Sequence, residues 1–509
     1  MSMELLSSIL LFLGLAAVLG VLKIGYNVIY NLWLSPLAQF PGPKLWAISA
    51  IPSQLSIVRG TIHFDITALH ERYGPVVRIR PNELAFNTAQ GFKDIYGFRP
   101  GGCFPKDRSR YMTPINGADH LVSAIDDGVH ARHRKLLSYA FSNRALREQE
   151  NVIRGFTDTM ITKVRGEVHA GRPTVDMKNW LNYTTFDITG DLMFGESFNC
   201  LRDTKLHPWI AMIFDSMKAL AIMGAAGQFP LLQPWLDKLI PAYLKKQEFD
   251  HFNLSAGKAD RRLESGVSPR GDFMSAFIQN GFVEKQEQFY EGKKILRRDE
   301  IHSNSFILML AGSETSATLL AGCIYFLCKS PETMQKLSDE IRSAFTSDSD
   351  ITFDKAATLP YLGAVLEEAM RCYPPVAAFL ARVVPPGGAS VDGYFIPEKT
   401  IVACHHYASY HSSSNFSRPN DFIPERWLGD PRFESDKRDA MQAFSLGPRN
   451  CIGKNMAYAE MRMILCKLLY HFDMELTPET TDWTNQKVYF LWAKKPLMVT
   501  MKDRLSSDY

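Results

Sequence analysis

Apolar residues run without interruption near the start of the chain. Leu5 to Leu22 contains no charged residue, and Lys23 follows it directly. A membrane-spanning helix needs about 20 apolar residues, so this stretch predicts one. A cleaved signal peptide is the alternative, but such peptides begin with basic residues, and this chain carries only Glu4 before the apolar run. We therefore expect an uncleaved transmembrane anchor over residues 1–30.

The residues after this anchor predict a short, stiff connector. The stretch SPLAQFPGPK carries three prolines within residues 31–44, and proline fixes the backbone. Lys23 and Lys44 follow the apolar run, so the positive-inside rule places the rest of the chain in the cytosol. No linker or internal repeat follows, and we expect residues 45–509 to form one domain.

Helical spacing of apolar residues dominates from about residue 130 to 345. The longest such segment, His302–Ser330, is apolar enough to resemble a second membrane span. Its centre, however, carries the polar residues Ser313, Glu314, Thr315 and Ser316. This pattern predicts a helix buried in the body of the protein. A last helix is expected from about Gly453 to Phe472.

Alternating apolar and polar positions predict a few short strands. Gly74–Asn87 indicates two strands around a turn at Pro81–Asn82, and Val391–Tyr407 indicates another. Lys487–Met501 predicts a terminal hairpin that turns near Lys494–Pro496. The expected fold is mainly α-helical, with a small β-rich part.

Composition excludes several classes of protein. The 509 residues are 46% hydrophobic and 22% charged, with a net charge of +3, so a globular protein is expected and a nucleic-acid partner is not. Eight scattered cysteines without a C-x-x-C pair do not form a disulfide framework. Three glycosylation sequons are expected to stay unmodified in the cytosol, and they begin at Asn182, Asn253 and Asn415.

One cysteine stands in an unusual setting, in the sequence FSLGPRNCIG. Cys451 has Gly447 and Gly453 around it, which would allow close approach of something flat or bulky. Arg449 and the start of the following helix are expected to lower the pKa of its thiol. Such a cysteine can be a plain buried residue, a nucleophile, a zinc ligand or a ligand of haem iron. No cysteine-protease signature surrounds it, and the nearest other metal-ligand residues lie on a predicted strand.

The segment Phe444–Gly453 matches the pattern F-x-x-G-x-R-x-C-x-G and thereby resembles the haem-binding signature of the cytochrome P-450 monooxygenases. Five fixed positions occur by chance in on the order of one chain in 10,000. The resemblance extends from about residue 40 to 500 and includes four other motifs in the family's order. These are EEAMR with Glu368 and Arg371, FIPERW with Arg426, AGSETS over Ala311–Ser316, and HARHR with His130 where the family has a tryptophan.

The resemblance implies the cytochrome P-450 fold, with haem b held between a long central helix and the cysteine loop. Cys451 would be the axial thiolate ligand of the iron. The family's pattern assigns the other cofactor contacts to Arg449, Arg134, His130, Arg382, Phe444 and Gly453.

The resemblance also assigns roles in catalysis. Ala311 and Gly312 would let the central helix open locally and leave room for O2. Thr315 and Glu314 would deliver protons, although a hydroxyl at this place can also bond the preceding turn of its own helix. Glu368, Arg371 and Arg426 would form a structural triad that holds the cysteine loop.

Substrate contacts are implied in the loop before His130, on the central helix, in the segment PPVAAFLAR and at the terminal hairpin. Their apolar character predicts a hydrophobic substrate of intermediate size, although core packing explains any one of them equally well. The residues are Phe104, Tyr111, Ile115, Leu121, Ile125, Val376, Ala377, Ala378, Phe379 and Phe490.

Electrons must come from another protein, because the chain has no G-x-G and so lacks the dinucleotide-binding fingerprint. The resemblance implies NADPH as the source, an NADPH-cytochrome reductase as the partner and cytochrome b5 as an optional second donor. Arg132, Lys135 and Lys454 are candidates for a basic docking face, with ordinary solvated surface as the alternative. The anchor fits the microsomal members, and this predicts a single-pass protein of the endoplasmic reticulum membrane.

The segments FPGPK, RVVPPGG and HARHRKLLSYAFS resemble the sequences of filamentous-fungal members such as isotrichodermin C-15 hydroxylase and averantin hydroxylase. We therefore predict the hydroxylation of a terpenoid, polyketide or alkaloid in secondary metabolism. Desaturation, epoxidation, ring closure or aryl coupling on the same fold is an alternative, and so is a reductase-independent haem-thiolate isomerase. A haem sensor and a membrane-anchored interaction protein are further alternatives.

Overall fold

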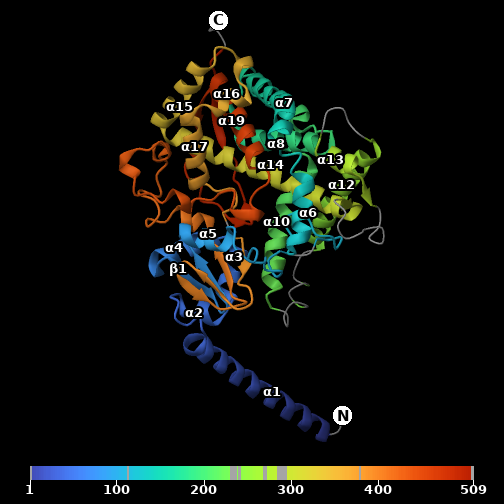
Figure 1. The fold of residues 1–509 in the computed structure, drawn as a ribbon, viewed down its shortest axis with the longest axis vertical. Coiled ribbons are helices and arrows are strands. Elements are labelled where there is room, and N and C mark those ends of the chain that lie inside the picture. The colour runs from blue at the N-terminus through green and yellow to red at the C-terminus, as the bar shows by residue number, and fades with distance from the viewer. Residues whose placement is uncertain are drawn as a thin grey trace.

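The computed structural model describes residues 3–111, 114–229, 235, 238, 242–266, 272–283, 295–377 and 380–505. These residues form a large helical part and a smaller part with most of the strands, and one long helix, α1 (Met3–Ile29), projects from the strand-rich part (Figure 1). The prediction of a mainly helical fold with a small β-rich part is confirmed.

The helix α1 makes an apolar rod outside the body. The most apolar 18-residue window within residues 7–34 has a mean hydropathy of 2.3, and none of that window is buried. Water would have to hydrate these side chains at a large free-energy cost, which suggests a membrane anchor. A π-helical turn, η1 (Tyr30–Leu34), ends the rod, and Arg78 Nη1 donates to the carbonyl of Asn31 at 2.6 Å, which ties the end of the rod to the sheet.

The main sheet joins segments that lie far apart in the chain. Its strand order is β1-β2-β9-β6, where β1 and β2 are antiparallel and β2 and β9 are parallel. The sheet therefore places the residues before the cysteine loop beside the N-terminal strands. Its strands are β1 (Val76–Arg80), β2 (Glu83–Phe86), β6 (Arg382–Val383) and β9 (Ile401–Cys404).

The remaining strands are short. β13 (Met498–Asp503) pairs with β10 (Phe472–Leu476) and with β3 (Thr174–Asp176). Three two-stranded pairs complete the set: β4 (Phe282–Val283) with β5 (Leu296–Arg297), β7 (Ala389–Val391) with β8 (Tyr394–Ile396), and β11 (Val488–Tyr489) with β12 (Leu491–Trp492).

The predicted terminal hairpin is placed differently from expectation. The turn is at Phe490, between β11 and β12, and not near Lys494–Pro496. Lys494 is instead buried against the central helix, and β13 pairs with strands from elsewhere in the chain. These long-range contacts outweigh the local turn preference of the Lys-Lys-Pro sequence.

The long central helix α14 (Arg298–Lys329) crosses the helical part (Figure 1) and packs against α8, α12, α17 and α19. It passes a length and hydropathy test for a membrane span, but 78% of its most apolar window is buried inside the protein. The prediction of a buried helix with a polar centre is thus correct.

The other helices surround α14. In the first half of the chain they are α2 (Lys44–Ile48), α3 (Ile51–Arg59), α4 (Ile62–Tyr73), α5 (Ala89–Tyr96), α6 (Asp127–Leu137), α7 (Asn143–His169), α8 (Met177–Phe194), α9 (Cys200–Asp203) and α10 (Pro208–Ala226). In the second half they are α12 (Ala242–Glu264), α13 (Phe273–Asn280), α15 (Pro331–Ala344), α16 (Phe353–Ala357), α17 (Pro360–Cys372), α18 (His406–Tyr410) and α19 (Lys454–His471). Short 3-10 turns are η3 (Asp348–Asp350), η4 (Pro424–Trp427), η5 (Pro431–Phe433), η6 (Arg438–Ala440), η7 (Gly447–Arg449) and η8 (Pro478–Thr480).

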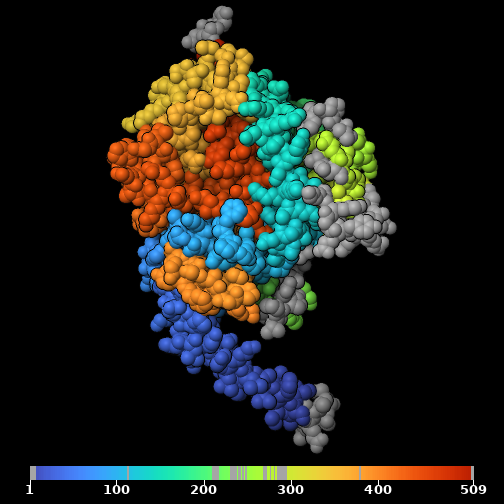
Figure 2. All heavy atoms as spheres, in the orientation of Figure 1, coloured from blue at the N-terminus to red at the C-terminus, as the bar shows by residue number. Residues whose placement is uncertain are grey.

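The cysteine loop, Phe444–Gly453, contains η7 and leads into α19. In Figure 2, C-terminal residues (red) occupy the centre of the visible face, between the cyan chain of the α6 and α7 region and orange chain that precedes the loop. Segments from three regions of the sequence therefore meet around this loop.

Candidate active site

The backbone of the cysteine loop is fixed by its own contacts. The N–H of Cys451 donates to the carbonyl of Phe444 at 2.8 Å, which closes the loop. Gly447 has a φ of +68°, and a Cβ there would collide with the backbone of Tyr96 and Gly97. The need for glycine at this position thus arises from contact with the end of α5, and not from clearance for a bound group as we expected.

The other glycine of the loop behaves differently. A Cβ on Gly453 would meet its nearest neighbours, Phe141 and the sulfur of Cys451, at 3.6 and 4.0 Å. These are ordinary contact distances, so the protein itself leaves room for a side chain here. Of the two loop glycines, Gly453 is the one whose smallness fits an additional group beside Cys451.

Cys451 is the only one of the eight cysteines that is exposed. Burial raises the pKa of the Cys451 thiol, while the N–H of Gly453 and the charges of Arg134 and Lys454 lower it. The expected net lowering of this pKa is therefore wrong for the protein alone, because desolvation outweighs the cations. A metal cation bound to the sulfur would deprotonate it outright.

Two predicted arginines join the cysteine loop to α6. Both Nη atoms of Arg134 donate to Asn450, at 2.6 Å to its carbonyl and 2.5 Å to its side chain. Arg449, with a side chain only 2% exposed, donates to the carbonyls of Ala124 and Ile125 and pairs with Asp127 at 2.6 Å. These contacts, at the two residues that precede Cys451, hold the cysteine loop against α6 and the residues just before it.

Two other cations nearby, Arg382 and Lys106, form no ion pair with a carboxylate in the described part of the chain. Nε and Nη1 of Arg382 are buried without any hydrogen-bond partner within the described part of the chain. Lys106 is buried beside Arg382, since the two residues form an isolated β-bridge, and its Nζ donates only to the carbonyl of Val122 in the contacts the structure records. Burial and the charges of Arg382 and Arg449 lower the pKa of Lys106 to about 6.

His130 lies close to the same cations. Burial, followed by the positive charges of Arg449, Lys106 and Arg134, lowers its pKa to about 3. Buried positive charge of this kind is costly unless an anion compensates it. The cluster of Arg382, Lys106 and His130 is therefore suited to bind a buried anionic group.

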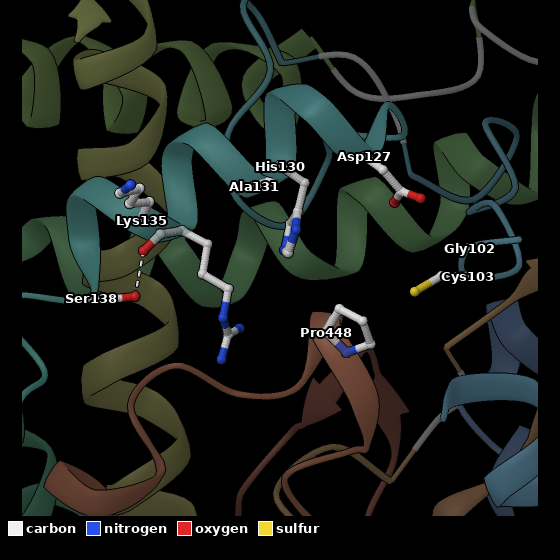
Figure 3. Close-up of a pocket in the computed structure, with 9 residues that line it drawn as sticks. Gly102, Cys103, Asp127, His130, Ala131, Lys135, Ser138 and Pro448 are labelled. Carbon is white, nitrogen blue, oxygen red and sulfur yellow. Dashed lines mark hydrogen bonds between the residues drawn. The ribbon is translucent and has the colours of Figure 1, made fainter. Parts of the chain in front are cut away.

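A pocket of about 440 Å³ opens beside this cluster. Figure 3 shows the ring of His130 and the sulfur of Cys103 directed toward Pro448, with Lys135 and Ser138 farther along α6. The pocket connects the surface of α6 with the cysteine loop. It is lined by Gly102, Cys103, Asp127, His130, Ala131, Arg134, Lys135, Ser138 and Pro448.

The central helix borders open space at one turn. Ala311 is exposed and Thr315 is partly exposed, although the residues between and beside them, Ser313, Glu314 and Ser316, are buried. A residue can be exposed in the middle of a buried helix only if the helix lines a cavity at that point. The face that carries Ala311 and Thr315 is therefore the face available to small reactants.

The predicted local opening of α14 is absent. The helix is continuous from Arg298 to Lys329, and the hydroxyl of Thr315 donates to the carbonyl of Ala311 at 2.7 Å, as in the alternative considered for it. Gly312 serves packing, because a Cβ there would meet the side chain of Thr189 on α8 at 3.1 Å. The carboxylate of Glu314 is directed to Lys494, with which it forms an ion pair at 2.6 Å.

The predicted triad is assembled and fully buried. Glu368 pairs with Arg371 at 2.8 Å and with Arg426 at 3.0 Å, and all three side chains are 0% exposed. Asp436, which the sequence analysis missed, pairs with Arg426. The cluster thus contains two acids and two arginines and carries no net charge. Trp427 adds a hydrogen bond from its Nε1 to Glu368 at 2.9 Å.

The residues assigned to a substrate pocket lie in different environments in the structure. Ile115 and Phe490 are exposed, by 41% and 46%, and Val376 is partly exposed. Tyr111 belongs with the cations, because Lys106 Nζ lies 5.1 Å from its ring centre. Ala378 and Phe379 lie outside the described residues.

Three further candidates lie in the core. Phe104 is 1% exposed and packs with side chains of β1, β2 and β9, under the guanidinium of Arg99 at 4.3 Å. Leu121 and Ala377 are buried in the main hydrophobic core. In this structure these side chains support the fold, as the core-packing alternative states.

Comparison with known proteins settles the family. The family model of Cytochrome P450 matches residues 40–501. The chain belongs to the cytochrome P450 family. Cytochrome P450 monooxygenase astJ of Aspergillus oryzae is 42% identical over 484 residues, which cover 94% of both chains. Averantin hydroxylase of Dothistroma septosporum is 42% identical and covers 94% of this chain and 89% of its own, and trichothecene C-15 hydroxylase of Fusarium sporotrichioides is 40% identical and covers 97% and 98%.

The prediction of a P450 that resembles fungal secondary-metabolite members is thereby confirmed. Membership makes the protein an oxidoreductase of the monooxygenase type and implies haem with a cysteine thiolate ligand. The residues present fit this cofactor: an accessible Cys451, room beside Gly453, and for a propionate the Nε and Nη1 of Arg382, which have no hydrogen-bond partner among the described residues. Lys106, which no motif marks, would join Arg382 there.

A buried carboxyl on α19 gives a test of the packing between α19 and α14. Ser316 donates to Glu460 Oε2 at 2.9 Å, Oε1 has no partner among the described residues, and burial raises the pKa of Glu460 to about 8. The folded protein therefore holds a proton that the unfolded chain loses above its ordinary pKa of 4.5, and stability falls as pH rises from about 4.5 to 8. Glu460→Gln is expected to lack this decline and to gain on the order of a few kcal/mol over the wild type between pH 5 and 8. Urea unfolding at several pH values measures the difference, and parallel stability curves would contradict it.

Proposed function

We propose that this P450 is a membrane-anchored monooxygenase that takes electrons from an NADPH-cytochrome reductase and hydroxylates a hydrophobic fungal metabolite of intermediate size. The observation that carries the proposal is the accessible thiol of Cys451, in a loop that buried ion pairs and Arg134 hold in place. Haem bound to this thiol would supply the chemistry of O2 activation.

The protein's own residues would prepare the reaction. The Ala311 and Thr315 face of α14 borders the space for O2 and substrate, and small side chains at this turn leave room for both. The hydroxyl of Thr315, which now donates to the Ala311 carbonyl, could turn toward the space beside Ala311 and would donate a hydrogen bond to O2 held there. Glu314, the preceding residue, is the nearest carboxyl in sequence that could supply a proton to this turn.

The reductase would dock on the face of α6 and the cysteine loop. Lys135 and Lys454 are exposed on this face, and Lys454 lies 5.7 Å from the ring centre of Phe444 within the haem-binding motif. Arg132 is a poorer candidate than we expected, since a bidentate pair with Glu300 occupies its guanidinium. An acidic flavoprotein surface would complement the two lysines.

The membrane part of the proposal uses α1 as a single-pass anchor in the endoplasmic reticulum, with residues 31–44 as connector and residues 45–509 as the cytosolic domain. The exposed apolar surface of α1 supports this arrangement. The names of the relatives, hydroxylases of averantin and of trichothecene C-15, support hydroxylation of a secondary metabolite. A terpenoid, polyketide or alkaloid scaffold is the proposed substrate class.

Reconstitution of the full chain with a fungal reductase in microsomes tests the proposal. With NADPH, ¹⁸O2 and a panel of such scaffolds, mass spectrometry is expected to find one product that contains one labelled oxygen. Thr315→Ala is expected to lower the yield of product per NADPH about 10-fold or more and to release hydrogen peroxide instead, because it removes the hydroxyl donor. Ser305→Ala removes a fully buried hydroxyl of the same helix, whose recorded contact is the sulfur of Met274 at 4.0 Å, and serves as the control for lost helix packing. Label incorporation without NADPH, or unchanged coupling in Thr315→Ala, would contradict the proposal.

A further inference from the structure

A buried lysine from the end of the chain contacts the central helix next to its reactive turn. Lys494 follows β12, and its side chain is 1% exposed. Its Nζ lies 2.6 Å from Glu314 Oε1 and 2.9 Å from Thr318 Oγ1, both on α14. A third contact, at 3.3 Å, joins it to Asn182 Oδ1 on α8. The lysine thus connects the terminal segment, α14 and α8 at one point.

The two oxygens of the Glu314 carboxyl have different environments. Its Oε1 accepts from both Lys494 and Thr318, whereas Oε2 is buried without a partner among the described residues. Burial raises the pKa of Glu314 and lowers the pKa of Lys494, and each charge opposes the shift of the other. Desolvation therefore brings the ionised pair and the neutral pair closer in free energy than they would be in water.

One side of the cluster approaches solvent. At the start of α8, Asp176 and Lys178 lie 3.5 Å apart, with side chains 16% and 18% exposed. Both act electrostatically on Lys494, Asp176 raising its pKa and Lys178 lowering it. Asp176 also accepts from the N–H of Leu497 at 2.9 Å, three residues after Lys494. Lys178 also lowers the pKa of Glu314, and the buried Tyr373 lies near Glu314.

Resting on the proposed role of Glu314, we propose that Lys494 is the residue that positions Glu314 and passes protons to it from solvent. A proton leaves Nζ of Lys494 and binds Oε1 of Glu314, and both groups become neutral. Glu314 then releases a proton to water in the space beside Ala311 and Thr315. Lys494 regains a proton from the side of Asn182, Asp176 and Lys178. Each cycle moves one proton inward and transfers no electron.

The contacts favour this function over a purely structural one. A buried ion pair is weak support for stability, because desolvation of both ions offsets their attraction. An apolar pair would fill the same space without that cost. The chain instead places a proton donor at hydrogen-bond distance from the only carboxyl on the central turn of α14.

The test compares Lys494→Met, Lys494→Arg and Lys467→Met in the full-length, haem-loaded protein. Lys467 on α19 is a matched control, because its side chain is 0% exposed and forms an ion pair with Asp348 at 2.6 Å. With reductase and NADPH, Lys494→Met is expected to lose about 10-fold or more of its product yield, with a larger solvent deuterium isotope effect. Lys494→Arg should restore part of the yield, and Lys467→Met should keep the coupling of the wild type even if it is less stable.

Hydrogen peroxide distinguishes proton supply from a damaged cavity, because it brings the oxygen atom together with both protons and both electrons. Peroxide-driven turnover of Lys494→Met is expected to stay within about 2-fold of the wild type. Equal losses with peroxide and with NADPH, or full NADPH coupling in Lys494→Met, would overturn the proposal. If Lys494→Met does not fold, Lys494→Gln replaces it in the same comparison, because its neutral amide can keep a hydrogen bond to Glu314 but cannot supply a proton.

Infrared difference spectra give a readout that needs no turnover. Without its cation, Glu314 should become protonated in Lys494→Met and give a carboxylic acid band that the further change Glu314→Gln removes. Absence of this band would overturn the pairing. If the wild type shows no reductase-driven turnover, the proposed function fails, and the infrared band still decides whether Lys494 controls the protonation of Glu314.

Discussion

Cys451→Ala is expected to abolish the absorption band near about 450 nm that the reduced, carbon monoxide-treated protein should show, because thiolate ligation is the origin of that band. Turnover with reductase should vanish with it. The loop itself should survive, since its closure uses the backbone N–H of Cys451 and the side chains of Arg134 and Arg449, none of which this change removes. Spectra of the purified full-length protein, with haem content measured in parallel, check the result.

Cys103→Ala is the matched control for this prediction. Cys103 lines the pocket beside α6, and the charges of Arg382 and Arg449 act to lower the pKa of its thiol. It is therefore a second cysteine close to the proposed cofactor edge. Its loss should leave the band unchanged. A Cys451→Ala protein that binds haem and keeps the band would contradict the assignment of the iron ligand.

The parts of the site that the sequence revealed are those that its local pattern determines. The spacing of glycine, arginine and cysteine around Cys451 lies within one loop, and Glu368 and Arg371 share a face of one helix turn. Burial of α14 could be predicted because four polar residues interrupt an apolar helix. In each case residues close in sequence carry the information.

What the sequence did not reveal depends on contacts between distant segments. Lys494 meets Glu314 only because the terminal segment passes α14, and the local sequence around Lys494 indicated a turn. Lys106 could be identified only from its isolated β-bridge to Arg382 in the structure. The role of Gly447 was misjudged because its close neighbour is the backbone of α5, far away in the chain. For the thiol of Cys451, the lowering effects were predicted and the larger effect of burial was not.

The buried cluster around Glu368 leads to the second prediction with a large effect. The carboxylate of Glu368 accepts from Arg371 and Arg426, from the N–H of Ile423 at 2.8 Å and from Trp427. Glu368→Ala removes one of the two acids and leaves two buried arginines with Asp436 alone. Removal of one partner of a buried pair typically costs about 3–5 kcal/mol, and we expect a loss of unfolding free energy in that range. Urea unfolding of the detergent-solubilised protein measures it.

Glu148→Ala is the control, because Glu148 also pairs with an arginine on its own helix but in solvent. The Arg144–Glu148 pair is 3.0 Å long with side chains 80% and 48% exposed, so its loss should cost less than about 1 kcal/mol. The contrast separates the effect of burial from the effect of the ion pair itself. Because Arg426 and Ile423 belong to the segment that leads to the cysteine loop, Glu368→Ala should also release haem faster than Glu148→Ala does. Equal stabilities of the two variants would show that the cluster does not hold the loop.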